Sequence, residues 1–193
     1  MRPDDVKRYV VGITGASGSV YGVRALEILA TLPGAEIHLV MSRSAARTME
    51  LETDFKPAQV EKLANVVHDP ANLAAAISSG SFRTDGMIVA PCSVKTAAAI
   101  AYSLNDNLLV RAADVMLKER RPLVLMVRET PLHLGHLRTL ARLASIGASI
   151  VPPIPGFYSR PQSVDDIVNH SVGKALDALG VPNDAFARWT GRL

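Results

Sequence analysis

The chain has 193 residues, of which 48% are hydrophobic and 20% are charged, the composition of a globular protein and not of a disordered or fibrous one. Its formal net charge of +3 comes with no basic run longer than two residues, so no nucleic-acid footprint is evident. The single cysteine excludes an intramolecular disulfide and a cysteine-built zinc site. No apolar run approaches the ~18 residues of a membrane helix, and the polar first residues predict no signal peptide. We therefore expect one cytoplasmic domain over residues 1–193 that contacts neither nucleic acid nor membrane.

Short apolar runs alternate with stretches of helical periodicity along the chain. Strands are predicted at residues 9–14, 35–41, 86–90, 122–127 and 148–151. Helices are predicted at residues 20–30, 43–51, 72–78, 97–101, 107–119, 137–144 and 164–179. Asp106 and Ser163 are the expected N-caps of the 107–119 helix and of the last helix. This alternation indicates the α/β class, a Rossmann-like three-layer αβα sandwich with a mostly parallel sheet.

Two segments at the predicted strand ends are candidates for function. Residues 123–127 are apolar, which predicts a central strand buried on both faces, and Arg128 and Glu129 follow it directly before Pro131. In open α/β sheets ligands bind outside the carboxyl ends of the strands, so this charged pair is placed to meet a ligand. The alternative is a surface ion pair that caps the strand. The proline-rich stretch at residues 152–162 is predicted to be a restrained functional loop.

Glycines follow the first predicted strand with the spacing Gly12-x-x-Gly15-x-x-Gly18. This is not the spacing of dinucleotide-binding proteins, but glycines let the backbone approach a ligand and a helix N-terminus attracts an anion. Gly15, Ala16 and Ser17 are therefore predicted to contact a ligand, the alternative being a tight turn that binds nothing. Ser42 ends the second predicted strand, and a hydroxyl there suits flavin mononucleotide (FMN) better than an adenine dinucleotide.

A second polar loop follows the predicted strand at residues 86–90. The hydroxyls of Ser93 and Thr96 open the next helix there and can donate to a phosphate or to the ring edge of a cofactor. Nothing else in the chain resembles a hydrolase, which disfavours Ser93 and Lys95 as a nucleophile and its base. Cys92 is predicted to be a buried small hydrophobic residue.

Several basic side chains are candidates for binding a phosphate group. Arg111 and Lys118 are seven residues apart on a predicted helix and share a face, although a solvated cationic stripe is the alternative. Lys174 lies at the edge of the inward stripe of its predicted helix. The residues that together would form a phosphate clamp are Arg128, Lys118, Lys174 and Tyr158. His133 and His136 have no third ligand near them in the sequence, so we predict no metal site.

Motifs along nearly the whole chain resemble those of one family. They are GITGASG at residues 12–18, GSFRTDGMIVAPCSVKT at 80–96, DN at 106–107, RAADVMLKERR at 111–121, RETPL at 128–132, PGFY at 155–158 and RW at 188–189. With these motifs in this order, the chain resembles the UbiX-like flavin prenyltransferases, relatives of the flavin-dependent cysteine decarboxylases. The resemblance implies noncovalent binding of FMN and transfer of a dimethylallyl group from dimethylallyl phosphate to the reduced flavin. It also implies that a UbiD-like decarboxylase receives the prenylated FMN, that no metal is needed, and that the chain forms a homo-oligomer, typically a dodecamer.

The resemblance assigns site residues by their positions in these motifs. Those that match flavin-contacting positions are Ser17, Ser42, Ser93, Thr96 and Arg111. Those that match the allylic phosphate site, part of which a neighbouring subunit supplies, are Lys118, Arg128, Tyr158 and Lys174. Lys174 stands where the family commonly has arginine, which keeps the charge but loses the bidentate fork, so we expect altered donor affinity or donor choice.

The resemblance also implies catalytic groups. Glu129 matches the acidic residue at the leaving phosphate and would shuttle a proton, and Ser17 lies beside the flavin as a second catalytic residue. A further site carboxylate is either Glu52 or the nearby Glu50. The candidate π faces around an allylic cation are Tyr158 and Trp189.

Two alternatives from other classes stay open at the level of sequence. A flavin-dependent cysteine decarboxylase would need a site histidine and an asparagine-bearing motif where Cys92 to Lys95 stands, and the chain lacks that motif. A noncatalytic flavin-binding subunit of an aromatic acid decarboxylase would keep the same flavin-binding motifs. The sequence does not decide between a monophosphate and a diphosphate donor.

Overall fold

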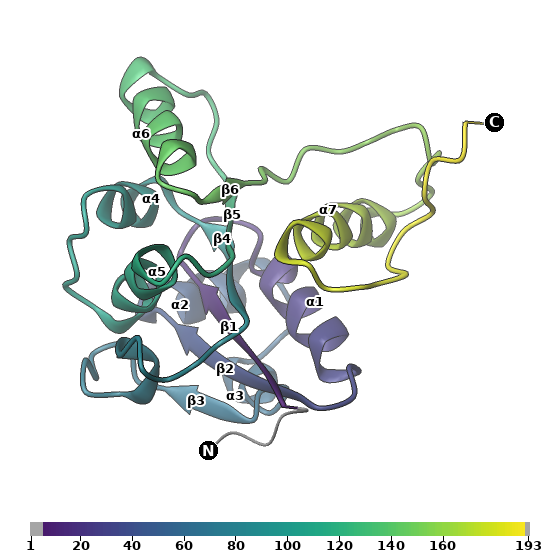
Figure 1. The fold of residues 1–193 in the computed structure, drawn as a ribbon. Coiled ribbons are helices and arrows are strands. Elements are labelled where there is room, and N and C mark those ends of the chain that lie inside the picture. The colour runs from purple at the N-terminus through teal and green to yellow at the C-terminus, as the bar shows by residue number, and fades with distance from the viewer. Residues whose placement is uncertain (1–5, 192–193) are drawn as a thin grey trace.

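A computed structural model describes residues 6–191 of the chain. Its core is a six-stranded sheet with the strand order β3-β2-β1-β4-β5-β6 (Figure 1). The strands are β1 (Lys7–Ile13), β2 (Ala35–Met41), β3 (Val66–His68), β4 (Gly86–Cys92), β5 (Leu123–Val127) and β6 (Ser149–Ile150). All neighbouring strands pair in parallel, so the predicted Rossmann-like α/β class is confirmed and the sheet is parallel throughout.

Helices cover both faces of the sheet, as Figure 1 shows. They are α1 (Ser19–Ala30), α2 (Arg43–Glu52), α3 (Pro57–Glu61), α4 (Val94–Ala101), α5 (Leu108–Lys118), α6 (Leu134–Ser145) and α7 (Val164–Leu179). Successive strand residues point to opposite faces, so Val11 packs in the core under α1 and α7 while Val10 packs in the core under α4 and α5. These two cores give the three layers that the alternating pattern predicts.

Side-chain caps fix where several helices begin. Ser42, Ser93 and Ser163 each accept a hydrogen bond from a backbone N–H in the first turn of the helix that follows. Gly180, with φ of 78°, ends α7 in the left-handed conformation that glycine tolerates best. The Ser163 cap predicted from the sequence is therefore confirmed.

Other expectations about the elements are wrong. Asn107 and not Asp106 caps α5, because the Asn107 side-chain oxygen accepts the Val110 N–H at 3.1 Å. The predicted helix at residues 72–78 is only a 3-10 turn (Ala76–Ser78). The hydrophobic pattern before it is too weak to predict α3 and the edge strand β3, which the structure contains. Lys174, expected at the edge of the inward stripe of α7, is exposed and lies outside that stripe.

Two segments frame the carboxyl end of the sheet. Residues 151–163 run from β6 across the molecule to α7, and the C-terminal segment folds back beside them (Figure 1). We call residues 152–162 the arm. Among residues 6–191, no helix is long and apolar enough to cross a membrane.

Candidate functional site

A cavity of about 300 Å³ opens where the carboxyl ends of the strands meet several helix N-termini. It lies beside the ends of β1 and β4, where the strand order reverses: β1 leads to β2 and β3 on one side, and β4 leads to β5 and β6 on the other. Ligands of doubly wound sheets bind at such a switch point. Four of the residues predicted to bind a flavin line this cavity, namely Gly15, Ser42, Ser93 and Thr96.

The buried hydroxyl of Thr14 ties the two strand ends together at the base of this cavity. It donates to the Pro91 carbonyl at 2.7 Å and accepts the Ser93 N–H at 2.9 Å. The side chain of Ser93 in turn donates to the Thr96 hydroxyl at 3.0 Å and caps α4. The polar wall of the cavity is therefore ordered by hydrogen bonds between residues of the chain itself.

Three helices direct their N-termini at the cavity. Their N-cap residues Ser42, Ser93 and Asn107 all line it, as do the cations Arg43 and Lys95. Helix N-termini carry partial positive charge and unpaired N–H groups, so together with these cations they attract an anion such as a phosphate monoester. The apolar part of the lining comes from Pro70, Ala71, Ala99, Leu109 and Val110. A polar, positive end and an apolar wall suit a ligand with a flat ring and a phosphate.

The glycine loop after β1 forms one border of the cavity. Gly18 has φ of 97°, a conformation that favours glycine, and its N–H donates to the Glu52 carboxylate at 2.8 Å. This hydrogen bond places Glu52 at the loop, whereas Glu50 pairs with Arg47 at 4.0 Å on α2. Glu52 is therefore the carboxylate that contacts the glycine loop.

Arg128 and Glu129 follow β5, as predicted, and line a second cavity with the start of the arm. The volume of this second cavity is about 530 Å³, and Pro152 to Pro155 form its other side. Arg128 is exposed and Glu129 is half-buried. Burial raises the pKa of the Tyr21 hydroxyl on α1, and the positive charge of Arg128 acts against that rise.

A cluster of aromatic side chains forms where the arm, α7 and the C-terminal segment meet. The Tyr158 hydroxyl lies 3.0 Å from Nε2 of His170, and the rings of Tyr158 and Trp189 meet edge to face with centroids 5.9 Å apart. Arg188 anchors the C-terminal segment through two hydrogen bonds of 2.9 Å to Asp177 of α7. Tyr158 and Trp189, predicted as a pair of π faces, are in contact.

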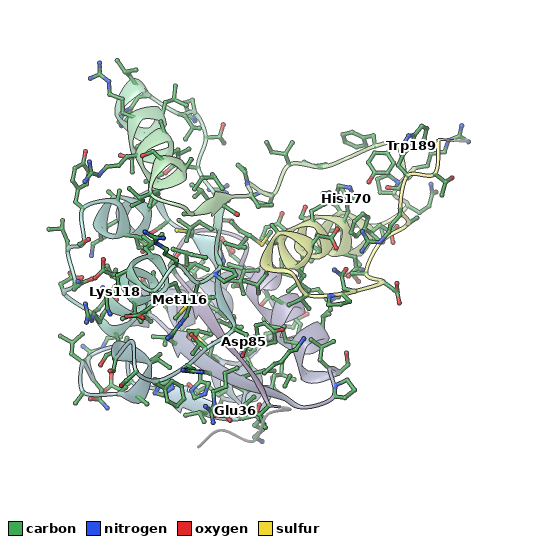
Figure 2. The ribbon with its side chains drawn as sticks, viewed as in Figure 1. Glu36, Asp85, Met116, Lys118, His170 and Trp189 are labelled. Carbon is green, nitrogen blue, oxygen red and sulfur yellow. The ribbon has the colours of Figure 1, made fainter. Side chains whose placement is uncertain are left out.

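Lys118 lies apart from these groups. Figure 2 shows it on the opposite side of the molecule from Trp189 and His170. It pairs with Glu119, and Arg111 on the same helix donates to the Ser78 carbonyl at 3.0 Å and pairs with Asp114 at 3.1 Å. Within one chain the predicted clamp of Arg128, Tyr158, Lys174 and Lys118 is therefore not gathered in one place.

The sequence analysis did not identify several residues of the 300 Å³ cavity beside β1 and β4, or His170 of the aromatic cluster. Lys95 and Asn107 line the cavity, and their places just after a strand and just before a helix could have identified them. No sequence pattern marks His170 as a site residue, because only the folded arm brings Tyr158 to it.

Burial raises the pKa of the Cys92 thiol to about 12, which confirms Cys92 as a buried, unreactive residue. Among residues 6–191 no group of three metal-ligating side chains forms, and His133 instead caps α6.

Comparisons with known proteins identify the family. The profile of the Flavoprotein family matches residues 1–176. The flavin prenyltransferase UbiX of Escherichia coli (strain K12) is 58% identical over 188 residues, which are 96% of this chain and 100% of that protein. A crystal structure of AnUbiX (PadA1) in complex with FMN and dimethylallyl pyrophosphate superposes with a TM-score of 0.94 at 48% identity, and covers 97% of this chain and 100% of that one. A dodecameric FMN-dependent UbiX-like decarboxylase from Escherichia coli O157:H7 has a TM-score of 0.93 at 50% identity, over 95% of this chain and 100% of that one. The chain therefore belongs to the flavoprotein family and, within it, to the UbiX flavin prenyltransferases.

Proposed function

We propose that this protein transfers a dimethylallyl group from dimethylallyl phosphate to reduced FMN and makes prenylated FMN for a UbiD-like decarboxylase. The observation that supports this most is the cavity at the strand-order reversal, in which three helix N-termini and two cations face an apolar wall. The identity of 58% to a UbiX flavin prenyltransferase over nearly the whole chain supports the same activity. We infer that residues 1–193 act as one flavoprotein domain.

The cavity residues suit FMN in particular. The N-termini of α2 and α4, capped by Ser42 and Ser93, supply N–H groups and positive charge for the phosphate, and Thr96 offers a hydroxyl to a polar edge of the ligand. Ala16 and Ser17 continue the glycine loop at the border of the cavity, where Glu52 fixes the backbone of Gly18. When bound, reduced FMN supplies the nucleophilic ring that accepts the dimethylallyl carbon.

The residues around the second cavity suit the departing phosphate. Arg128 offers a bidentate fork, and Glu129 beside it can move a proton to the phosphate as the carbon–oxygen bond breaks. Lys174, the Tyr158 hydroxyl and Trp189 lie outside the lining of this cavity, and we infer that the assembled protein brings them to the phosphate as a point charge, a donor and a π face. These groups stabilise the charge that grows on the phosphate, which is usually the largest catalytic contribution in such sites.

We infer that part of the donor site comes from a neighbouring subunit. Lys118 lies on the opposite side of the molecule from His170 and Trp189, whereas a symmetric assembly can bring it to a neighbour's arm (Figure 2). A UbiX-like relative is dodecameric, and we propose the same assembly here. We further place the reaction in the cytoplasm, because it consumes reduced FMN and the cytoplasm is reducing.

The test is an anaerobic incubation of the protein with FMN, a reductant and dimethylallyl phosphate, followed by mass spectrometry of the released flavin. We expect the flavin to gain the mass of one dimethylallyl group. A matched incubation with dimethylallyl pyrophosphate identifies which donor is used. An unchanged flavin mass with both donors, although FMN binds, would instead identify a noncatalytic flavin-binding subunit.

A variant tests the role of Glu129 separately. Glu129→Gln keeps the shape of the side chain but cannot exchange a proton, so we expect FMN to bind normally while prenylated flavin forms roughly 100-fold more slowly, the usual size of a general-acid contribution. Glu50→Gln on α2 is the matched control, because Glu50 pairs with Arg47 away from the cavity. A normal rate in Glu129→Gln would remove this carboxylate from the reaction.

A further inference from the structure

His170 is held in one position under Tyr158. The side chain is only 8% exposed, and its Nε2 lies 3.0 Å from the Tyr158 hydroxyl. The Tyr158 ring meets the imidazole edge to face with centroids 5.5 Å apart, and the Phe186 ring does the same from the C-terminal segment at 5.0 Å. Figure 2 shows His170 on α7, below the segment that carries Trp189. The imidazole thus fills the space between α7, the arm and the C-terminal segment.

Gly156 on the arm makes room for this arrangement. A Cβ atom at this position would lie 2.9 Å from Cε1 and 3.1 Å from Nε2 of His170, and 3.2 Å from the Tyr158 ring. The first of these distances is shorter than a Cβ contact tolerates, so a larger residue would push the imidazole away from the phenol. Glycine is therefore needed here for space beside His170 and not for an unusual backbone conformation.

The surroundings of His170 also fix where its proton lies. Burial lowers the pKa of His170, and the positive charge of Lys174 one turn along α7 lowers it further, so the ring is neutral near pH 7. Its Nδ1 is buried and has no hydrogen-bond partner among residues 6–191. A buried N–H without an acceptor is rare and costly, so the single proton of the neutral ring belongs on Nε2. The Nε2 N–H then donates to the Tyr158 oxygen.

We propose that His170 is a positioning residue that sets the direction of the Tyr158 hydroxyl for binding the donor phosphate. Because the phenolic oxygen accepts from His170, its own hydrogen points away from the imidazole and is free to donate to an anion. Lys174 on the same helix adds its charge nearby. This inference rests on the proposed function, since it assigns the ligand of Tyr158 as the phosphate of the allylic donor.

Two substitutions at His170 separate hydrogen bonding from packing. His170→Leu fills the space without a donor, and we expect KM for dimethylallyl phosphate to rise roughly tenfold, the value of one hydrogen bond to a charged group. We expect FMN affinity to stay the same, because His170 does not line the flavin cavity. His170→Gln restores an N–H donor of similar reach and should recover most of the donor affinity. Failure of His170→Gln to recover it would overturn the proposal.

A double-mutant cycle with Tyr158→Phe tests whether His170 acts through the hydroxyl. In the Tyr158→Phe background, His170→Leu should leave KM unchanged, because the oxygen that it orients is gone. An equal rise in KM in both backgrounds would show that His170 acts on something else and would overturn the proposal.

Gly156→Ala should raise KM for dimethylallyl phosphate as His170→Leu does. Phe186→Leu is the packing control, since it loosens the same ring without touching the hydrogen bond, and an equal effect on KM would overturn the proposal.

A binding measurement keeps this inference distinct from the proposed function. Calorimetric titration of dimethylallyl phosphate onto the assembled protein loaded with oxidised FMN measures donor affinity without turnover. Binding that weakens tenfold in His170→Leu supports the positioning role even if no prenylated flavin ever forms, in which case only the proposed reaction fails. Unchanged binding in His170→Leu, alongside normal prenylation by the wild-type protein, overturns the positioning role alone. If the wild-type protein neither binds nor turns over the donor, both are overturned.

Discussion

Replacing Thr14 by valine should weaken both the fold and the flavin cavity. Thr14 is 2% exposed, and its hydroxyl is the acceptor for the Ser93 N–H at 2.9 Å. Valine has the same shape but no acceptor, so a buried N–H at the start of α4 loses its partner. The Pro91 carbonyl loses the 2.7 Å hydrogen bond from the hydroxyl but keeps the one from the Thr14 N–H at 3.2 Å. The main loss is therefore one unsatisfied donor, which costs about 2 kcal/mol.

The assay is thermal unfolding followed by circular dichroism at a fixed protein concentration, with and without FMN. For a chain of this length, about 2 kcal/mol lowers Tm by roughly 4–8 °C. Since the Ser93 loop also lines the cavity, fluorescence titration should show weaker FMN binding by Thr14→Val. Thr14→Ser is the control, because it keeps the hydroxyl and should keep FMN affinity. Wild-type Tm and wild-type FMN affinity in Thr14→Val would refute the argument that this hydroxyl joins the two strand ends.

Three further predictions follow from single contacts. Asn107→Ala should lower the free energy of unfolding by about 1 kcal/mol, as loss of an N-cap does, while Asp106→Ala should have a much smaller effect in the same urea titration. The Arg188 guanidinium hydrogen-bonds Asp177 and holds the pKa of that carboxyl below its usual range, so the stability from this pair is present above about pH 4 and lost as the pH falls through the lowered pKa. Fluorescence of the single tryptophan should report that loss, and Asp177→Asn should abolish it, whereas an identical acid transition in the variant would refute the assignment. Lys174→Ala should raise KM for dimethylallyl phosphate with FMN affinity unchanged, and a fall in FMN affinity instead would show that Lys174 serves the flavin.

Periodicity in the sequence predicted the central strands because these are buried on both faces. β5 reads as five apolar residues in a row, and the start of α7 is marked by the Ser163 capping box. The edge strand β3 was missed because it has only three residues, of which Val67 is exposed, so no alternation develops. The N-cap of α5 was placed one residue early because Asp106 and Asn107 are both good caps. Only the backbone geometry of the folded chain shows which of the two adjacent residues is the N-cap.

The sequence predicted local parts of the site but not how distant parts meet. The loops that carry Gly15, Ser42 and Ser93 follow strands, and strand ends of a parallel sheet meet at one edge, so their shared cavity was foreseeable. The contact between Tyr158 and His170 depends on the path of the arm, for which no periodicity exists. Lys174 was placed at the edge of the inward stripe and is exposed, because helical spacing alone does not mark where a buried face ends.

The separation of the cations within one chain argues that assembly and catalysis are linked. Arg128 lies on the second cavity, whereas Lys118 lies on the far side of the molecule from Trp189 (Figure 2). A phosphate contacts only groups within a few ångströms, so a clamp that includes Lys118 can form only when a second subunit presents that residue. A variant that stays monomeric should therefore still form the cavity that Gly15, Ser42 and Ser93 line, because the elements that carry these residues pack together within one sheet. It should lose affinity for the allylic donor, because the donor site lacks its second half.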